Sequence, residues 1–317
     1  MNRVAILAHE QVTLFELACA VEIFGLERPE YDDWYRCDVV SLSAGPFRTS
    51  ADILLSTGQV ESLRDYDTLV IPSWPVATEP VAERVASEVS QFDAEGKRIL
   101  TFCSGAFLLG RLGLLDGRKA TTHWLYAERF KQQFPQVDYV DNVLYVFDGR
   151  LGCSAGSAAG IDLGIEVIRQ DYGYQRANQV ARRLVMSPQR KGGQAQFVET
   201  PVIKSPSQFA GAIDWVLANL SQPISVDQMA EKACMSRRSF DRKFRAAYDC
   251  SANAWLIQIR LNRAKTLLES ESCSIDQVAE RSGFDNATSM RYHFDKQLGI
   301  SPKEYRACFH RSELVMD

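Results

Sequence analysis

The stretch ILTFCSGAFLLG, residues 99–110, joins two kinds of pattern. Its first residues form a short apolar run that contains β-branched and aromatic side chains, which is typical of a buried strand. The residues after Cys103 carry apolar side chains at helical spacing, which indicates a helix. Cys103 therefore lies at a predicted strand-to-helix turn. Two interpretations are open at this point: Cys103 is a nucleophile, or it is the floor of a site that binds a small molecule.

The same alternation of strand and helix recurs over residues 1–190. Strand patterns occur in RVAILA, CDVVSLSA, TLVIPSW, RILTFC and LYVFDGRLGCSAG, and helical patterns follow most of them. Strands that alternate with helices favour a mainly parallel sheet covered on both faces. We therefore predict an α/β fold, a flavodoxin-like sandwich, with its binding residues at the carboxyl ends of the strands.

Length and composition exclude several classes of protein. The chain has 317 residues, which exceeds a usual single domain of about 100 to 200, so we expect two domains. The eight cysteines show no CxxC or Cys/His pair at metal-ligand spacing, so we expect no metal, no cofactor and no disulfide framework. Apolar runs are far shorter than the about 20 residues of a membrane span, and the start lacks a signal peptide. We expect a cytoplasmic protein without a membrane partner.

The segment QRKGGQAQFVETPVIKSPSQ, residues 189–208, has no helical period and several breaker residues. We predict domains at residues 1–190 and 208–317, joined by a linker at residues 191–207. From Pro201 onward there are 16 Lys and Arg against 14 Asp and Glu, a net charge of +2, whereas residues 1–200 carry 20 against 26, a net charge of −6. This asymmetry indicates two different partners.

The C-terminal part contains a repeat, because SVDQMAEKACMS at residues 225–236 returns as SIDQVAERSGFD at residues 274–285. Each copy opens with Ser-x-x-Gln, the pattern of a capping box that starts a helix. A short helix, a tight turn and a second helix follow in each copy. Apolar residues four apart bury one face of each second helix: Phe240 with Phe244, and Met290 with Phe294. The repeat predicts an all-α domain with two helix-turn-helix units.

The outward face of each second helix is the predicted DNA interface. Guanidinium groups bond guanine edges in the major groove, and neighbouring ones bind phosphates. The predicted DNA-binding residues are Arg237, Arg238, Ser239, Arg242 and Arg245 in the first copy and Asn286, Thr288, Ser289 and Arg291 in the second. The alternative is a solvated charged face without a partner.

Between the copies, SANAWLIQIRLNRAKTLLES has the pattern of one helix of about 18 residues, roughly 27 Å long. Such a helix could hold two recognition helices about one DNA turn apart, near 34 Å. Near the end of the chain, Ser301 to Glu304 form another capping box, with proline at the first helical position.

These features, with LNRAKTLLES and GISPKEY, resemble the AraC/XylS family of transcriptional regulators from Phe209 to about His310. Both helix-turn-helix units, the connecting helix and the closing Gly-x-Ser-Pro-x-x-Tyr are present in order. The resemblance implies sequence-specific binding of double-stranded DNA, and commonly activation of transcription through contact with RNA polymerase.

Position alone does not decide what Cys103 does. A cysteine at a strand-to-helix turn faces helix amides, which stabilise the thiolate, lower its pKa and also suit a bound anion. Nucleophilic catalysis further needs a base and an oxyanion hole. His123 in KATTHW and Glu16 in VTLFELACAVEIFG are the candidate base and carboxylate.

VAILAHEQVTLFELACAVEIFG, TLVIPSW, ILTFCSGAFLLGRLGLLDGRKATTHW and GCSAGSAAGIDLGIEVI together resemble the PfpI/ThiJ branch of the class I glutamine amidotransferase-like superfamily, over about Arg3 to Met186. In that branch a cysteine elbow lies beside a glutamate, and a histidine follows. These roles map onto Cys103, Glu16 and His123. Combined with an AraC/XylS tail, the chain resembles the GlxA/FtrA type of regulator, in which this domain senses a ligand.

Two departures from that branch favour binding over catalysis. Its enzymes carry Gly-Gly where this chain has Ser73 and Trp74, and the amidotransferase His-x-Glu pair is absent after His123. Replacing glycine restricts the backbone that supplies an oxyanion donor and adds a bulky ring. We therefore expect a sensor and not an enzyme. The predicted ligand-binding residues are Glu16, Trp74, Cys103, Ser104, His123 and Trp124.

The leading hypothesis is a DNA-binding regulator, expected to be a homodimer and an activator, controlled by a small-molecule effector. Because aromatic rings attract ammonium groups, an amine or an amino-acid derivative is the expected effector. The alternative is a cysteine-dependent hydrolase or amidase of the PfpI/ThiJ type, in which Cys103, His123 and Glu16 are catalytic and the helical domain is accessory. A third hypothesis makes Cys103 an oxidation switch.

Overall fold

Seven strands form one sheet in the order β10-β11-β7-β6-β1-β2-β5, and only the β10–β11 pair is antiparallel. The computed structural model describes residues 2–77, 79–186, 193–194 and 209–309. The strands are β1 (Arg3–Leu7), β2 (Arg36–Ser41), β5 (Gly58–Gln59), β6 (Thr68–Ile71), β7 (Arg98–Thr101), β10 (Tyr145–Phe147) and β11 (Leu151–Ser154). Two small pairs lie apart from this sheet: β3 (Phe47–Arg48) with β4 (Leu54–Leu55), and β8 (Lys119–Ala120) with β9 (Asp138–Tyr139).

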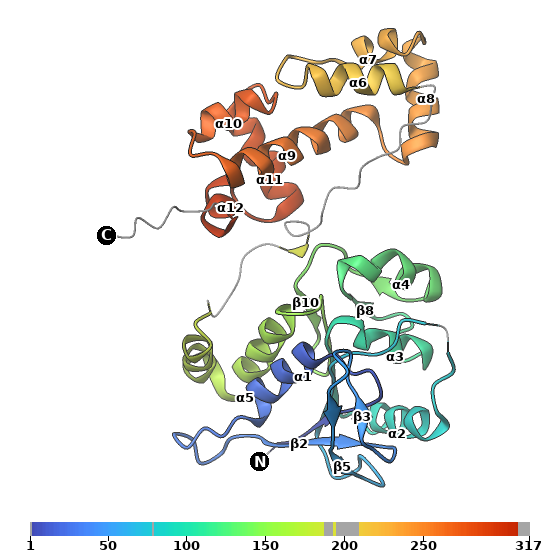
Figure 1. Ribbon diagram of the computed structural model, residues 1–317, viewed down its shortest axis with the longest axis vertical. Helices are drawn as coiled ribbons and strands as arrows, with labels where there is room; N and C mark the ends of the chain where they lie inside the picture. Colours follow the sequence, from blue (N-terminus) through green and yellow to red (C-terminus); the bar gives the residue numbers. More distant parts are fainter. Residues whose placement is uncertain (1, 78, 187–192, 195–208, 310–317) are drawn as a thin grey trace. The chain divides into compact units, whose positions relative to one another are not determined.

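Helices cover both faces of the sheet (Figure 1). One face is covered by α1 (Leu14–Ala20), the π-helical turn η1 (Val21–Gly25) and α5 (Ala159–Arg183). The other is covered by α2 (Glu83–Ala94), α3 (Ala106–Arg111) and α4 (Ala127–Gln133). Two short 3₁₀ turns, η2 (Cys103–Gly105) and η3 (Trp124–Tyr126), precede α3 and α4.

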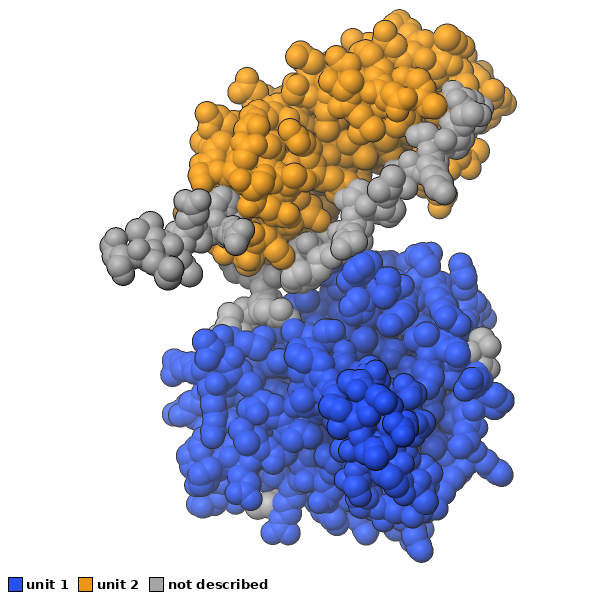
Figure 2. Space-filling model, viewed as in Figure 1, with its two compact units in different colours: residues 1–194 blue, residues 195–317 orange. Residues whose placement is uncertain are grey.

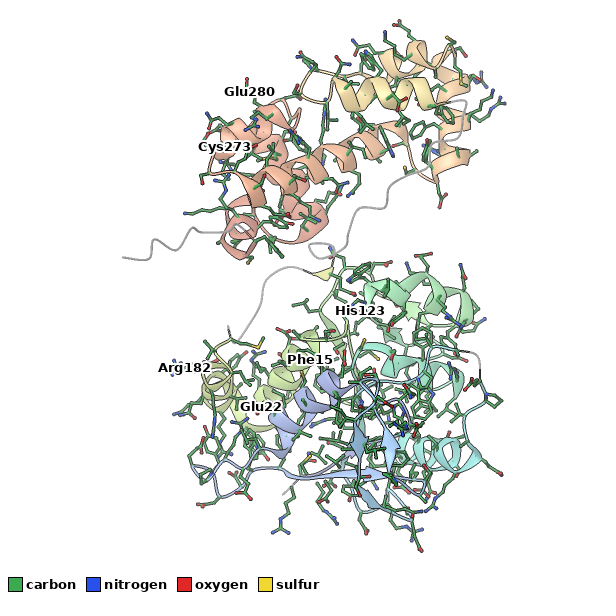
Figure 3. The ribbon with its side chains drawn as sticks, viewed as in Figure 1. Phe15, Glu22, His123, Arg182, Cys273 and Glu280 are labelled. Carbon is green, nitrogen blue, oxygen red and sulfur yellow. The ribbon has the colours of Figure 1, made fainter. Side chains whose placement is uncertain are left out.

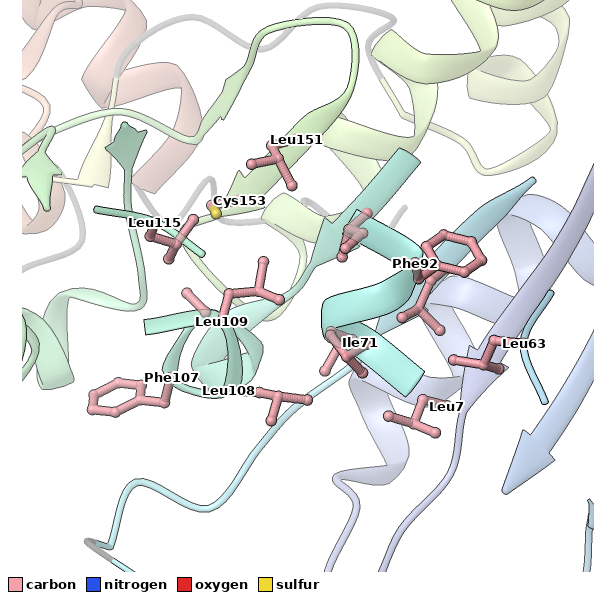
Figure 4. Packing of buried hydrophobic residues seen from close by; sticks show 14 of the residues in the cluster. Leu7, Leu63, Ile71, Phe92, Phe107, Leu108, Leu109, Leu115, Leu151 and Cys153 are labelled. Atoms are coloured by element: carbon pink, nitrogen blue, oxygen red, sulfur yellow. The ribbon is translucent and has the colours of Figure 1, made fainter. Parts of the chain in front are cut away.

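Neighbouring residues of each central strand point to opposite sides of the sheet, as the pleat of a strand requires. In β6, Leu69 and Ile71 join the core that contains Phe92 and Phe107 (Figure 4), whereas Val70 joins the other core. All these side chains are at most 2 % exposed. The predicted α/β sandwich with a mainly parallel sheet is confirmed.

The stretch LYVFDGRLGCSAG forms a hairpin of two strands, β10 and β11. Asp148 makes the turn between them, because its Oδ1 accepts hydrogen bonds from the amides of Arg150 at 2.8 Å and Leu151 at 2.6 Å. Gly149 within the turn has φ 98°, which glycine adopts without strain. The sheet therefore ends on one antiparallel edge strand.

The chain divides into two compact units, residues 1–194 and 195–317 (Figure 2), which we call the first and second units. The second unit is all-helical over its described residues, as predicted. Its helices are α6 (Ala210–Ala218), α7 (Val226–Lys232), α8 (Arg237–Tyr248), α9 (Ala252–Ser270), α10 (Ile275–Arg281), α11 (Ala287–Leu298) and α12 (Pro302–Phe309). Most of the predicted linker, residues 191–192 and 195–207, lies outside the described residues.

Helix α9 belongs to both hydrophobic cores of the second unit. Its first half contributes Trp255 and Leu256 to the core formed with α6, α7 and α8. Its second half contributes Leu261 and Leu268 to the core formed with α10, α11 and α12. With 19 residues, α9 is about 28 Å long. One continuous helix therefore joins the two helix-turn-helix units.

The predicted helix starts are confirmed at the atomic level. The hydroxyl groups of Ser225 and Ser274 each accept a hydrogen bond at 3.2 Å from the backbone amide of the glutamine three residues on. The backbone amide of each serine in turn donates to the side-chain oxygen of that glutamine at 2.8 Å. Ser301 and Glu304 form the same reciprocal pair, with Pro302 as the first residue of α12. These bonds satisfy amides that a helix start otherwise leaves without partners.

A second contact joins the two helix-turn-helix units beside α9. Gly283, in the turn between α10 and α11, has φ 82°, and a Cβ there would lie 1.9 Å from the carbonyl oxygen of Leu220. Only glycine permits this approach. Arg260 of α9 donates from Nη2 to the carbonyl oxygen of Gln222 at 3.2 Å. The segment before α7 is therefore held against the second helix-turn-helix unit.

None of the helices in the described part of the chain is both long enough and apolar enough to cross a membrane. Within the same residues, no group of three or more His, Cys, Asp or Glu side chains is placed to bind a metal ion.

Candidate functional site

The ends of four neighbouring strands, β1, β6, β7 and β11, meet at one edge of the sheet in the first unit. His9 follows β1, Ser73 and Trp74 follow β6, Cys103 follows β7, and Ser157 follows β11. Helix α1 brings Glu16 to the same edge, where Ser157 Oγ donates to Glu16 Oε1 at 3.3 Å. This is the place at which open α/β sheets bind their ligands. Figure 3 labels His123, and it labels Phe15 next to Glu16 on α1.

Cys103 lies in a tight turn. Its φ is 50°, in the left-handed region that a residue with a side chain adopts rarely. Gly105 in the same turn leaves no room for a side chain, because a Cβ there would lie 2.4 Å from the carbonyl oxygen of Ile71. The side chain of Cys103 is only 9 % exposed. The strand-to-helix turn predicted from the sequence is therefore present and tightly packed.

Three of the predicted site residues meet around the Cys103 thiol. The thiol contacts the Glu16 carboxyl group and the backbone amides of Ser104 and Ser157. A Cβ placed on Gly156 would lie 3.0 Å from Cys103 Sγ and 2.7 Å from His123 Cδ2, so the sulfur and the imidazole border the same glycine. The structure thus brings Glu16, Cys103 and His123 to one place.

The thiol of Cys103 is not activated. Burial raises its pKa to about 12, and the neighbouring charge of Glu16 adds to the rise. The amides of Ser104 and Ser157 act in the opposite direction but do not outweigh these two effects. The expectation that the turn lowers the pKa of Cys103 is therefore wrong, because burial and the carboxylate dominate over the helix amides. A protonated thiol is a weak nucleophile.

His123 is poorly arranged to act as a base toward Cys103. The amide of Leu125 donates to His123 Nδ1 at 3.1 Å and starts η3, so the neutral ring carries its proton on Nε2. Burial lowers the pKa of His123, which favours this neutral form. Within the described residues, His123 is not a hydrogen-bond partner of the Cys103 thiol. The ring can donate a hydrogen bond from Nε2, but the lone pair of Nδ1 already accepts the hydrogen bond from the amide of Leu125.

The position expected to supply an oxyanion donor is occupied. The backbone amide of Trp74 donates to Ser104 Oγ at 3.1 Å. Ser73 Oγ accepts from the amide of Thr13 at 3.0 Å. Two buried serines thus bind two amides at the edge of the site. An amide already hydrogen-bonded does not stabilise a new oxyanion without breaking that bond.

Both tryptophans named from the sequence lie at this edge and are half-buried. The ring of Trp74 lies 4.6 Å from that of His9, and the ring of Trp124 lies 5.4 Å from that of His123, measured between ring centroids. The two tryptophan rings therefore border the site, Trp74 beside His9 and Trp124 beside His123.

Sequence reasoning missed His9 and Ser157. His9 Nε2 lies 2.7 Å from the carbonyl oxygen of Ser73, which connects the segments after β1 and β6. Burial lowers the pKa of His9. A signal was available in both cases, because AHE and SAGS directly follow predicted strands whose ends converge.

In the second unit, α8 presents an exposed arginine face. Phe240 and Phe244 are fully buried, as predicted, and anchor the opposite face. Arg238, Arg242 and Arg245 are exposed. Within the described residues, none of these three guanidinium groups forms an ion pair with a carboxylate. Three cationic groups are therefore available to a polyanion on one helix.

Arg237 differs from the other arginines of α8. It pairs with Asp227 of α7 at 2.9 Å and with Asp241 of α8 at 2.8 Å. These bonds raise its pKa. Ser239, which was also predicted to contact DNA, is half-buried, and its amide is capped by Ser236 Oγ at 3.4 Å. We therefore expect Arg237 and Ser239 to orient α8 more than to bind bases.

The second recognition helix, α11, is more polar than charged at its start. Asn286 caps α11 by accepting from the amide of Ser289 at 2.8 Å. Thr288 and Arg291 are exposed. Sequence reasoning missed Tyr292, which is 60 % exposed on α11. An aromatic residue in the middle of an otherwise polar helix face is the signal that could have identified it.

With this geometry known, comparison with known proteins assigns the first unit. Residues 2–170 match the model of the DJ-1/PfpI family. The chain belongs to the DJ-1/PfpI family. Residues 229–307 match a second model, described as a helix-turn-helix domain. The DJ-1/PfpI domain is thus joined to a helix-turn-helix domain in one chain.

The relatives include two regulators from Pseudomonas aeruginosa. The chain is 28% identical over 291 residues to HTH-type transcriptional regulator CdhR, covering 91% of this chain and 86% of the relative. It is 28% identical over 240 residues to HTH-type transcriptional regulator ArgR, covering 75% of this chain and 72% of the relative. Among solved structures, an AraC family transcriptional regulator from Pseudomonas putida has the same fold, with a TM-score of 0.52 and 19% identity over 58% of this chain and all of the other.

These findings confirm the predicted combination of a PfpI-type domain with an AraC-type helix-turn-helix domain. They also confirm the predicted class of protein, a DNA-binding transcriptional regulator. The relatives are named as regulators and not as enzymes. In the DJ-1/PfpI domain the thiol of Cys103 is protonated, the Nδ1 atom of His123 accepts a hydrogen bond from the amide of Leu125, and the amide of Trp74 donates to Ser104.

The raised pKa of Cys103 predicts slow alkylation. At pH 8 a thiol with a pKa of about 12 is about one part in 10⁴ thiolate. We expect iodoacetamide to modify Cys103 at least about 100-fold more slowly than the exposed Cys234, as measured by peptide mass spectrometry of the full chain. Glu16→Gln should speed the reaction, because it removes the charge that raises the pKa.

Glu22→Gln is the matched control, because Glu22 acts on Cys19 and not on Cys103. An alkylation rate for Cys103 equal to that for Cys234 at pH 8 would contradict the protonated state derived above.

Proposed function

We propose that this protein is a sequence-specific transcriptional regulator in which a catalytically inactive DJ-1/PfpI domain senses a small-molecule effector. The observation that carries the proposal is the arginine face of α8 on a helix-turn-helix scaffold: Arg238, Arg242 and Arg245 are exposed and form no ion pair with any described residue. Such a helix fits the major groove of double-stranded DNA.

The two recognition helices, α8 and α11, differ in the contacts that they can make with DNA. The guanidinium groups of Arg238 and Arg242 suit guanine edges and phosphates. On α11, the hydroxyl of Thr288 and the guanidinium of Arg291 make fewer and weaker contacts, with Asn286 and Ser289 at the helix start. We therefore expect α8 to carry most of the sequence discrimination.

The chemistry of the site supports a sensor role for the first unit. The site has a buried carboxylate, a protonated thiol and a neutral imidazole, and its oxyanion position is occupied. The protonated thiol, the engagement of His123 Nδ1 by the Leu125 amide and the occupied amide of Trp74 oppose nucleophilic catalysis. The same groups offer an acceptor at Glu16 and a donor at His123 Nε2, with Ser104 and the rings of Trp74 and Trp124 around them. They are suited to hold a small polar molecule.

The buried carboxylate indicates the charge of the effector. Glu16 is 6 % exposed, and its partners are the Ser157 hydroxyl and the Cys103 thiol, both neutral donors. Within the described residues, no lysine or arginine pairs with Glu16. A buried charge is costly without a counter-charge. An ammonium group on an amine or an amino-acid derivative would supply one, and the Trp74 ring would add a cation–π contact.

Contact with RNA polymerase and activation stay predictions from the resemblance to the AraC/XylS family. A homodimeric assembly and a cytoplasmic location also stay predictions. The boundaries at residues 1–190, 191–207 and 208–317 likewise stay predictions. A ligand changes DNA affinity in such a regulator only through different affinities for two states of the protein, and each tenfold preference contributes about 1.4 kcal/mol.

Removing single arginines of α8 tests the DNA interface. Arg238→Ala and Arg242→Ala should each weaken binding by about 1 to 3 kcal/mol, or roughly 5- to 150-fold. The measurement is fluorescence anisotropy at fixed salt with a duplex that the wild-type chain selects from a random pool. Lys303→Ala on α12 is the control, since it removes one exposed positive charge elsewhere in the second unit. Losses no larger than that of the control would place the base-reading face elsewhere.

A thermal-shift screen tests the effector class. Amines, quaternary ammonium compounds and amino acids at about 100 times their dissociation constant should raise the melting temperature of the full chain by about 5 °C or more. Glu16→Gln should lose the shift because it removes the counter-charge, whereas Glu22→Gln should keep it. An equal shift with Glu16→Gln, or stabilisation by anionic analogues alone, would contradict a cationic effector.

A further inference from the structure

Gly193 and Gln194 belong to the segment predicted as a linker, yet they pack inside the first unit. The side chain of Gln194 is only 5 % exposed. Its Nε2 donates to Thr121 Oγ1 at 3.2 Å, and Thr121 is fully buried. A linker residue with this degree of burial is held in place by the domain before it.

Gly193 adds a second, independent contact. A Cβ on Gly193 would lie 1.8 Å from the carbonyl oxygen of Asn142 and 2.5 Å from its Oδ1. Only a glycine allows the backbone to approach so closely. We call the contacts of Gly193 with Asn142 and of Gln194 with Thr121 the linker dock.

The linker dock is continuous with the candidate ligand site. Thr121 holds Gln194, and the next residue, Thr122, donates from Oγ1 to the carbonyl oxygen of Cys103 at 2.7 Å. The residue after that is His123, which borders Gly156 together with Cys103. Three consecutive residues thus contact the linker, the cysteine turn and the ligand site.

We propose that the linker dock is the element through which occupancy of the Cys103 site controls the linker to the DNA-binding unit. This inference rests on the proposed function and names the regulation of the same site. A ligand that moves His123 or the Cys103 turn changes the position of Thr121, and with it the surface that holds Gln194. By thermodynamic reciprocity, release of Gln194 changes the site in turn.

The dock is also weak enough to be released. Gln194 Oε1 is buried without a hydrogen-bond partner among the described residues. Leaving a buried carbonyl oxygen unpaired has a cost that offsets much of the gain from one neutral hydrogen bond. A contact held by one such bond and a close backbone approach is suited to two states of similar free energy.

The test uses the full chain with substitutions in the dock. Gln194→Ala removes the hydrogen bond, and Gly193→Ala places a methyl group against Asn142. One readout is the rate at which iodoacetamide modifies Cys103, and the other is the affinity for the duplex selected by the wild-type chain. We expect each variant to raise the rate and to shift the affinity, both by at least about threefold.

Gln196→Ala is the matched control, the same substitution two residues further along the linker, and should change neither readout. The proposal is overturned if both dock variants leave either readout unchanged, or if Gln196→Ala reproduces their effects. Failure of the proposed function is separate, since it would appear as a wild-type chain that selects no duplex at all. The alkylation arm still tests the dock in that case.

Discussion

The DNA-binding unit depends on one constraint, which is that α9 is buried in two cores at once. Trp255 and Leu256 hold its first half in the core of α8, and Leu261 and Leu268 hold its second half in the core of α11. A helix packed at both ends cannot turn one half without disturbing the other. The contact of Gly283 with Leu220 fixes the same relation from the side. Both recognition helices therefore act as parts of one rigid body.

The DJ-1/PfpI domain retains the geometry of a reactive cysteine but not its electrostatics. The Cys103 turn keeps its left-handed backbone, and Glu16 and His123 lie beside it. Burial and the carboxylate keep the thiol protonated, and the Ser104 hydroxyl occupies the amide of Trp74. What is left is a buried negative charge among neutral donors. We propose that this arrangement binds a ligand and that its position beside Thr121 and Thr122 couples ligand binding to the start of the linker.

Much of this structure could be predicted from the sequence. The spacing of apolar residues and the positions of turn residues predicted the parallel sheet, and the Ser-x-x-Gln pairs predicted the starts of α7 and α10. These predictions succeeded because each depends on residues that are close in the sequence. The expected lowering of the pKa of Cys103 by the turn was wrong, since burial by distant segments and the charge of Glu16 outweigh the helix amides. The ion pairs of Arg237 with Asp227 and Asp241 and the burial of Gln194 were also missed, because they depend on tertiary contacts that no local pattern encodes.

The most direct test of the central claim is the spacing of the two DNA half-sites. The full chain would be titrated with its selected duplex and with versions that carry about 5 extra base pairs, half a helical turn, between the half-sites. Because α9 holds α8 and α11 rigidly and α11 makes the weaker contacts, we predict that this insertion weakens binding at least about fivefold and that a full-turn insertion does not restore it. Affinity that stays within about twofold across these duplexes would contradict a rigid pair of recognition helices.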